Sequence, residues 1–175
     1  LWKTNGTPAG TESVKDINPA GDSSPAHLYA WNGALYFAAN DGTNGIELWT
    51  SDSTEGGTAI VKPLDSLGTP QDGGINPSPG SSTPAGFIPF DGELYFIADN
   101  GSNGAELWKT DGTGAGTVLV KDIRSGFESA GPDRLTVLGD NLYLTADDGT
   151  SGIELWRLGT GADVAFADID PPGGN

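Results

Sequence analysis

A Leu-Trp pair recurs four times along this chain of 175 residues, at separations of 47, 59 and 48 residues. The copies begin at Leu1, Leu48, Leu107 and Leu155, and a glutamate precedes each of the last three. A Gly-Thr-containing stretch follows every pair, and a Leu-Tyr block precedes each of the last three copies. Self-similarity at such a period is the signature of a repeat architecture, in which each unit buries its apolar surface against its neighbours.

Each unit contains four short apolar segments separated by turn residues. In one full unit they cover residues 85–90, 93–98, 105–110 and 117–123, and they are rich in β-branched and aromatic residues. Asn32-Gly33 and Asp91-Gly92 separate the first two segments, and Asp140-Asn141 is expected at the same place in the last unit. Asn-Gly and Asp-Gly favour two-residue hairpins. Because no stretch shows a sustained helical period, the sequence predicts an all-β fold.

Four antiparallel strands in about 47 residues is the size of a β-propeller blade. A sandwich would not repeat its sequence at this interval, and the coils of a β-solenoid are shorter. The second segment of each unit is apolar on both faces, which indicates a sheet packed between two others. We therefore predict a β-propeller-type repeat of four-stranded antiparallel blades, about three and a half in this chain.

The predicted array consists of a half blade at residues 1–20, blades at 21–65, 86–124 and 125–170, and a tail at 171–175. The longest interval between copies places an insert at 66–85, and its Pro, Gly and Ser content predicts a loop. An open array exposes strand edges and apolar sheet faces. We therefore expect other copies of the chain, or the rest of a longer chain, to complete the blades.

The motif Glu-Leu-Trp-x-x-Asp-Gly-Thr-x-x-Gly-Thr is complete at residues 106–117. It resembles the ELWxxDGT-repeat family of bacterial and archaeal extracellular proteins. The first copy has Asn5 in place of the aspartate, the second has Ser53 in place of the glycine, and the fourth shortens after Trp156. The resemblance implies propeller-like blades and an extracellular or cell-surface location, and it implies no particular activity.

The amino-acid composition argues against several classes of binding partner. The chain has 24 acidic and 8 basic residues and a formal net charge of −16. This argues against nucleic-acid binding, which requires a basic surface, and against docking on anionic membranes. The apolar runs are too short for membrane insertion. Cysteine and methionine are absent, which removes disulfides and thiolate sites and suits an oxidising exterior.

Catalysis has little support in the sequence. His27 is the single histidine, and neither a serine-hydrolase elbow nor a zinc-protease motif is present. Carboxylates are numerous, but they recur from unit to unit, whereas a catalytic site needs an asymmetric constellation. We therefore expect no catalytic residues and no enzymatic activity.

The tryptophans divide into two groups. The four motif tryptophans are predicted to pack between blades, with sugar stacking as the alternative: Trp2, Trp49, Trp108 and Trp156. Trp31 stands outside the motif, beside a predicted hairpin turn, and is the candidate ligand contact.

Acidic and amide residues recur in register near the start of each Trp strand. They form a candidate calcium set, because calcium prefers carboxylate and amide oxygens: Asp41, Asn44, Glu47, Asp99, Asn103, Glu106, Asp147, Asp148 and Glu154. The alternative is ordinary turn chemistry, since Asp and Asn cap turns with their own side chains. In that case the glutamates are expected to pair with lysines of neighbouring strands, Lys15, Lys62 and Lys121. Calcium is the one cofactor under consideration.

We expect a secreted, non-enzymatic structural repeat protein, a subunit of a cell-surface or extracellular filamentous or ring assembly. One alternative is an adhesion module that binds carbohydrate or a cell-surface protein, with calcium sites. Another is a non-catalytic fragment of a larger extracellular enzyme. The expected partners are other copies of the chain or the rest of a longer chain, not nucleic acid.

Overall fold

A computed structural model describes residues 1–63, 69, 71, 73–77, 80–160 and 167–168. These residues form strands and one 3-10 turn at Pro8–Gly10, so the predicted all-β class is confirmed. No helix in this part of the chain is long and apolar enough to cross a membrane.

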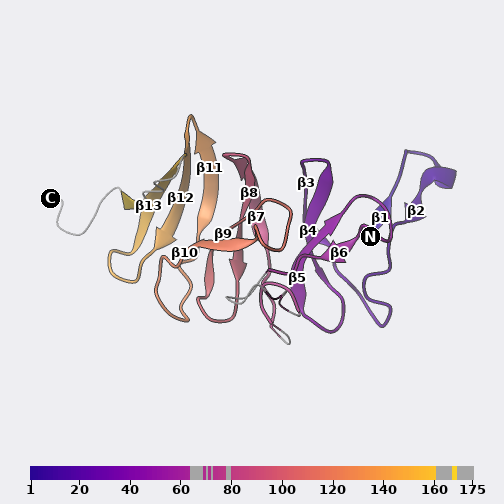
Figure 1. The fold of residues 1–175 in the computed structure, drawn as a ribbon, viewed down its shortest axis with the longest axis horizontal. Helices are drawn as coiled ribbons and strands as arrows, with labels where there is room; N and C mark the ends of the chain where they lie inside the picture. Colours follow the sequence, from indigo (N-terminus) through magenta and orange to yellow (C-terminus); the bar gives the residue numbers. More distant parts are fainter. Residues whose placement is uncertain (64–68, 70, 72, 78–79, 161–166, 169–175) are drawn as a thin grey trace.

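The strands form four antiparallel sheets that follow one another in chain order. Figure 1 shows them side by side, from the indigo N-terminal sheet to the orange and yellow fourth sheet. The first sheet contains β1 (Trp2–Lys3) and β2 (Glu12–Ser13). The second contains β3 (Ala26–Trp31), β4 (Ala34–Asn40), β5 (Ile46–Ser51) and β6 (Ala59–Ile60). The third contains β7 (Ala85–Phe90), β8 (Glu93–Asp99), β9 (Ala105–Thr110) and β10 (Val118–Lys121). The fourth contains β11 (Asp133–Leu138), β12 (Asn141–Asp147), β13 (Ile153–Gly159) and β14 (Ala167–Asp168).

The strands of the third sheet match the predicted segments to within two residues at each end. Ala85, the last residue of the predicted insert, is the first residue of β7. Within the insert, the described residues 69, 71, 73–77 and 80–84 form no strand, as expected of a loop. The tail at 171–175 lies outside the described residues.

Two-residue turns join the first two strands of each four-stranded sheet. Asn32 and Gly33 both have positive φ, and so do Asp91 and Gly92, as the dipeptides predict. In the fourth sheet the turn is Gly139-Asp140, one residue earlier than predicted, because β12 already begins at Asn141. Gly139 takes the first left-handed position, with φ of 59°.

A bulge interrupts the first strand of each four-stranded sheet at the same position. His27, Gly86 and Arg134 all have positive φ, and the pairing register shifts beside each of them. An extra residue in one strand bends it and increases its twist. The repeat period alone did not reveal this feature.

The Asp-Gly-Thr loop between the third and fourth strands is a closed network of side-chain hydrogen bonds. In the copy at 110–117, Asp111 Oδ1 accepts from both the N–H and the hydroxyl of Thr113, at 2.8 and 2.7 Å. Thr113 Oγ1 in turn accepts from the Gly116 N–H (3.0 Å), and Thr117 pairs with Thr110 (2.7 Å). The loops at 4–11 and 51–58 contain the same bonds, so the motif encodes one loop conformation.

Three apolar clusters hold the sheets together, one at each junction. The first junction packs Leu1 and Ile17 against Phe37 and Trp49 of the second sheet. The second and third junctions have larger clusters that repeat one pattern. In that pattern, the tyrosine of the second strand and the leucine of the motif face the following sheet. That sheet contributes its own Leu-Trp tryptophan and a Leu-x-Phe or Leu-x-Leu pair.

Candidate functional site

In the second and third sheets, the glutamate of the Glu-Leu-Trp motif holds the segment that leads into the next sheet. Glu47 on β5 is fully buried. Its Oε2 accepts hydrogen bonds from the Ile75 N–H (2.8 Å) and the Ser82 hydroxyl (2.6 Å). Its Oε1 accepts from the Ser82 N–H (3.0 Å). Ile75 and Ser82 lie between β6 and β7, so one carboxylate holds this linker at two points.

Glu106 on β9 repeats the arrangement at the next junction. Its carboxylate accepts from the N–H groups of Ile123 (3.0 Å) and Ala130 (3.1 Å), which lie between β10 and β11.

Burial raises the pKa of Glu47 to about 7. Burial also raises the pKa of Glu106, and the negative charge of Asp122 adds to the effect. Since these groups have lost water, their hydrogen bonds with the linker are what makes burial tolerable.

The predicted pairing of these glutamates with lysines is wrong for Glu47 and Glu106, because their carboxylates accept from backbone amides instead. Lys15 donates to the carbonyl oxygen of Thr58 (2.8 Å), in the Asp-Gly-Thr loop of the following sheet. The signal for the glutamate contacts was present in the sequence. An isoleucine and a later proline recur in every linker, at Ile17 and Pro25, Ile75 and Pro84, and Ile123 and Pro132.

The acidic loops before the Trp strands have the geometry of side-chain-capped turns. Asp41 Oδ1 accepts from the N–H groups of Thr43 (2.9 Å) and Asn44 (2.8 Å), and its Oδ2 accepts from the Asn44 amide (2.6 Å). These bonds lower the pKa of Asp41, against the opposing effect of burial. Asn100 accepts from Asn103, and Asp148 accepts from Ser151, in the same way.

The preceding residue caps the glycine of each loop. Asn40, Asp99 and Asp147 accept from the N–H groups of Gly42, Gly101 and Gly149, at 2.7, 2.6 and 2.7 Å. Most of the candidate calcium set is therefore occupied within its own turn, and Glu47 and Glu106 bind the linkers instead. No group of three or more acidic or histidine side chains positioned to hold a metal ion occurs among the described residues. Calcium binding stays a prediction.

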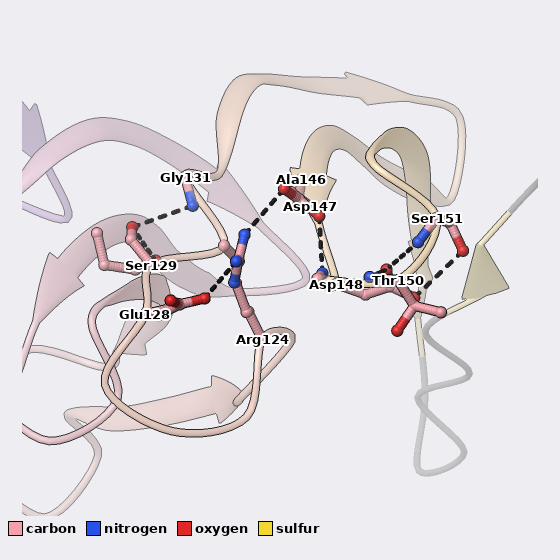
Figure 2. Close-up of polar contacts among 12 residues, drawn as sticks. Arg124, Glu128, Ser129, Gly131, Ala146, Asp147, Asp148, Thr150 and Ser151 are labelled. Carbon is pink, nitrogen blue, oxygen red and sulfur yellow. Dashed lines mark hydrogen bonds and ion pairs between the residues drawn. The ribbon is translucent and has the colours of Figure 1, made fainter.

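Each linker also touches the acidic loop of the following sheet. A Cβ built on Gly42 would lie 2.7 Å from Asn18 Oδ1, and one on Gly101 would lie 2.7 Å from Asn76 Oδ1. In the third linker an arginine occupies this position, as Figure 2 shows. Arg124 donates to Asp147 (2.9 Å) and to Glu128, so an ion pair replaces the amide contact.

The motif tryptophans differ in burial. Trp49, Trp108 and Trp156 are nearly fully buried and belong to the clusters between consecutive sheets. Trp2 contradicts the packing role predicted for it, because it is 69% exposed. The other three each pack against the preceding sheet, whereas Trp2 belongs to the first of the described sheets. The exposure of a motif tryptophan therefore depends on whether another sheet packs against it, and the motif sequence does not determine it.

Three apolar side chains of the fourth sheet are exposed on its outward face: Leu138, Ile153 and Leu155. Leu155 is 44% exposed, whereas Leu48 and Leu107 at the same position of the repeat are fully buried. Leu138 is 69% exposed, whereas its equivalent Phe90 is buried. Ile153 on the same face is 75% exposed, and Glu154, unlike Glu47 and Glu106, is only half-buried.

An open cavity of about 460 Å³ lies at the hairpin end of the second sheet. Its lining includes Trp31, Ala34, Leu35, Ser51 and Ser53. Trp31 itself is half-buried and lies against Tyr36, with ring centroids 5.8 Å apart. Part of Trp31 therefore packs in the second junction, and part borders this cavity.

We compared the chain with family models, curated proteins and solved structures, and none of them matches it.

Proposed function

We propose that this chain is a non-enzymatic structural repeat protein. Its propeller-type blades resemble those implied for the ELWxxDGT-repeat family. It acts outside the cell or at the cell surface, as a subunit of a ring or filament assembly. The observation that carries the proposal is the uncovered apolar face of the fourth sheet, formed by Leu138, Ile153 and Leu155.

The first and the fourth sheet each present a surface that is packed against a neighbouring sheet at the internal junctions. Each internal junction packs a tyrosine-and-leucine face against the tryptophan face of the following sheet. The fourth sheet presents a free face of the first kind, with Tyr143 half-buried and Leu155 exposed. The first sheet presents a free tryptophan, Trp2. The occupant we propose for the fourth sheet is therefore the N-terminal sheet of a second copy.

A contact of this kind joins two different surfaces, so it propagates from copy to copy. Such heterologous contacts form a ring if the rotation closes and a filament if it does not. The net charge of −16 opposes nonspecific association, which leaves the apolar face as the attractive contact. Added salt should therefore strengthen association.

The experiment is a measurement of molar mass by light scattering over a range of concentrations, with micrographs of the largest species. We expect the wild-type chain to form oligomers. Leu155→Asp should shift the mass to that of the monomer, because it places a charge in the contact. The matched control is Phe127→Ser, which removes an exposed aromatic side chain from a loop and should leave association unchanged.

A wild-type chain that stays monomeric at every concentration would contradict the proposal. Equal association of the wild type and Leu155→Asp would contradict the assigned face. Circular dichroism of both variants checks that the loss of mass does not come from unfolding.

A further inference from the structure

Lys3 of β1 reaches the cavity at the hairpin end of the second sheet, because its Nζ donates a hydrogen bond to the carbonyl oxygen of Ser53 (3.0 Å), and Ser53 lines that cavity. Within the described part of the chain, β1 pairs with β2 and with no other strand. The equivalent strands β5, β9 and β13 each lie between two neighbours. The strand that would flank β1 on its free side corresponds to β4, β8 and β12, which carry the Leu-Tyr-Phe or Leu-Tyr-Leu pattern.

The second junction shows what fills the corresponding space. There Tyr36 of β4 reaches the Asp-Gly-Thr loop of the third sheet, where a Cβ added to Gly112 would lie 2.7 Å from the tyrosine oxygen. Gly112 is the repeat equivalent of Ser53, which lines the cavity. Leu94, which packs in one cluster with Tyr36, is fully buried. Its equivalent Leu35 is only half-buried and also lines the cavity.

We propose that the free edge of β1 and this cavity form a strand-addition site. Its occupant is an extended segment with the Leu-Tyr-Phe pattern. The backbone of that segment pairs with Trp2 and Lys3, and its tyrosine ring enters the cavity beside Leu35 and Ser53.

The register of the other sheets defines the pairing. The tyrosine pairs with the residue after the motif tryptophan, as in Tyr36 with Thr50, Tyr95 with Lys109 and Tyr143 with Arg157. The residue after the tyrosine pairs with the tryptophan itself, as in Phe96 with Trp108. At the free edge these partners are Lys3 and Trp2. Backbone hydrogen bonds supply affinity in such a complex, and the side-chain pocket supplies specificity.

This inference deepens the proposed function, because an added hairpin and the β1–β2 sheet together make a complete four-stranded unit. The test does not depend on self-association. The probe is a fluorescently labelled peptide of residues 93–99, Glu-Leu-Tyr-Phe-Ile-Ala-Asp, titrated with the full chain carrying Leu155→Asp. The matched control is the same peptide with Tyr95→Ala.

We expect saturable binding of the tyrosine peptide, and binding at least about tenfold weaker for the alanine peptide, as loss of a buried ring predicts. A second variant pair tests the cavity. Ser53→Phe should fill it and weaken binding about tenfold or more, whereas Glu55→Phe, in the same loop but outside the lining, should bind as before. Circular dichroism confirms that both variants are folded.

The inference is wrong if no saturable binding occurs, if both peptides bind equally, or if Ser53→Phe binds as well as Glu55→Phe. Failure of the peptide together with concentration-dependent association of the wild type would leave the proposed function intact. Peptide binding by a chain that never associates would support this site and contradict the assembly.

Discussion

Single residues of the Asp-Gly-Thr loop have roles that the motif letters do not explain by themselves. The side chain of Asp52 folds back over its own loop, and a Cβ on Gly57 would lie 2.0 Å from its Oδ1. A Cβ on Gly10 would lie equally close to Asn5 Oδ1, and one on Gly116 equally close to Asp111 Oδ1. The second glycine of the motif is therefore required by close approach of the capping side chain. Asn5 serves in the first copy because the contact needs only an acceptor oxygen at that position.

We predict that Gly57→Ala lowers the free energy of unfolding by about 2 kcal/mol or more, because an overpacked site must displace the capping carboxylate. Gly56→Ala is the matched control. A Cβ there meets no atom within 4 Å, and the other two loops carry Ala9 and Ala115 at this position. Its expected change is within about 1 kcal/mol, in the stabilising direction. Urea unfolding of both variants measures the difference, and equal values would refute the packing argument.

At the scale of elements, the linker between β6 and β7 and the linker between β10 and β11 each depend on one buried carboxylate. The linker between β6 and β7 is longer than the others because it carries the insert. It nevertheless supplies Ile75 and Ser82 to Glu47, as the shorter linker supplies Ile123 and Ala130 to Glu106. The two contact points are seven residues apart in both linkers, so the insert is accommodated before Ile75 and leaves the junction unchanged.

These carboxylates give the fold a distinctive dependence on pH. The pKa of Glu47 is about 7 in the folded chain, above its ordinary value of 4.5. The folded state therefore binds more protons than the unfolded state between these values, and the stability contributed by this group falls as pH rises from about 4.5 to about 7. Since the pKa of Glu106 is also raised, its contribution has the same sign.

We expect Glu47→Gln to flatten the pH dependence of the unfolding free energy in this window, and Glu47→Gln with Glu106→Gln to flatten it further. Glutamine also places a donor opposite backbone N–H groups, which costs about 1–3 kcal/mol at all pH values. Glu55→Gln, at an exposed glutamate, is the control and should keep the wild-type profile. A wild-type profile that rises with pH through this window would contradict the raised pKa values.

At the scale of the whole molecule, the sheets follow one another in a row (Figure 1), and each apolar cluster of the described residues joins two consecutive sheets. The stability of such arrays is close to a sum of unit and junction contributions, so it varies along the chain. The third sheet is covered on both faces, whereas both strands of the first sheet are exposed.

We therefore expect a gradient of amide hydrogen exchange. Amides of β8 and β9 should exchange more slowly than those of β1 and β2, by on the order of 100-fold. The measurement uses the Leu155→Asp chain, so that association does not protect the end sheets. Uniform protection across all four sheets would show that the chain unfolds as a single cooperative unit and would contradict the prediction.

The sequence by itself determined the strands, the hairpins and the loops. Asn32-Gly33 and Asp91-Gly92 form the predicted turns because their conformation depends on local φ preferences. Since the units repeat, each one could be compared with the others, and the strands of the third sheet match the predicted segments to within two residues at each end. In the fourth sheet the hairpin turn predicted at Asp140-Asn141 lies one residue earlier, because Gly139 adopts the left-handed conformation more readily.

Only the tertiary structure decided which partners these elements have. Glu47 and Glu106 were expected beside lysines or calcium, yet they bind linker amides that lie 17–35 residues away. Trp2 and Trp49 share a motif and differ in burial, and Leu107 and Leu155 do the same. Identical residues differ in this way because burial depends on whether a neighbouring sheet covers them, and local sequence carries no information about that.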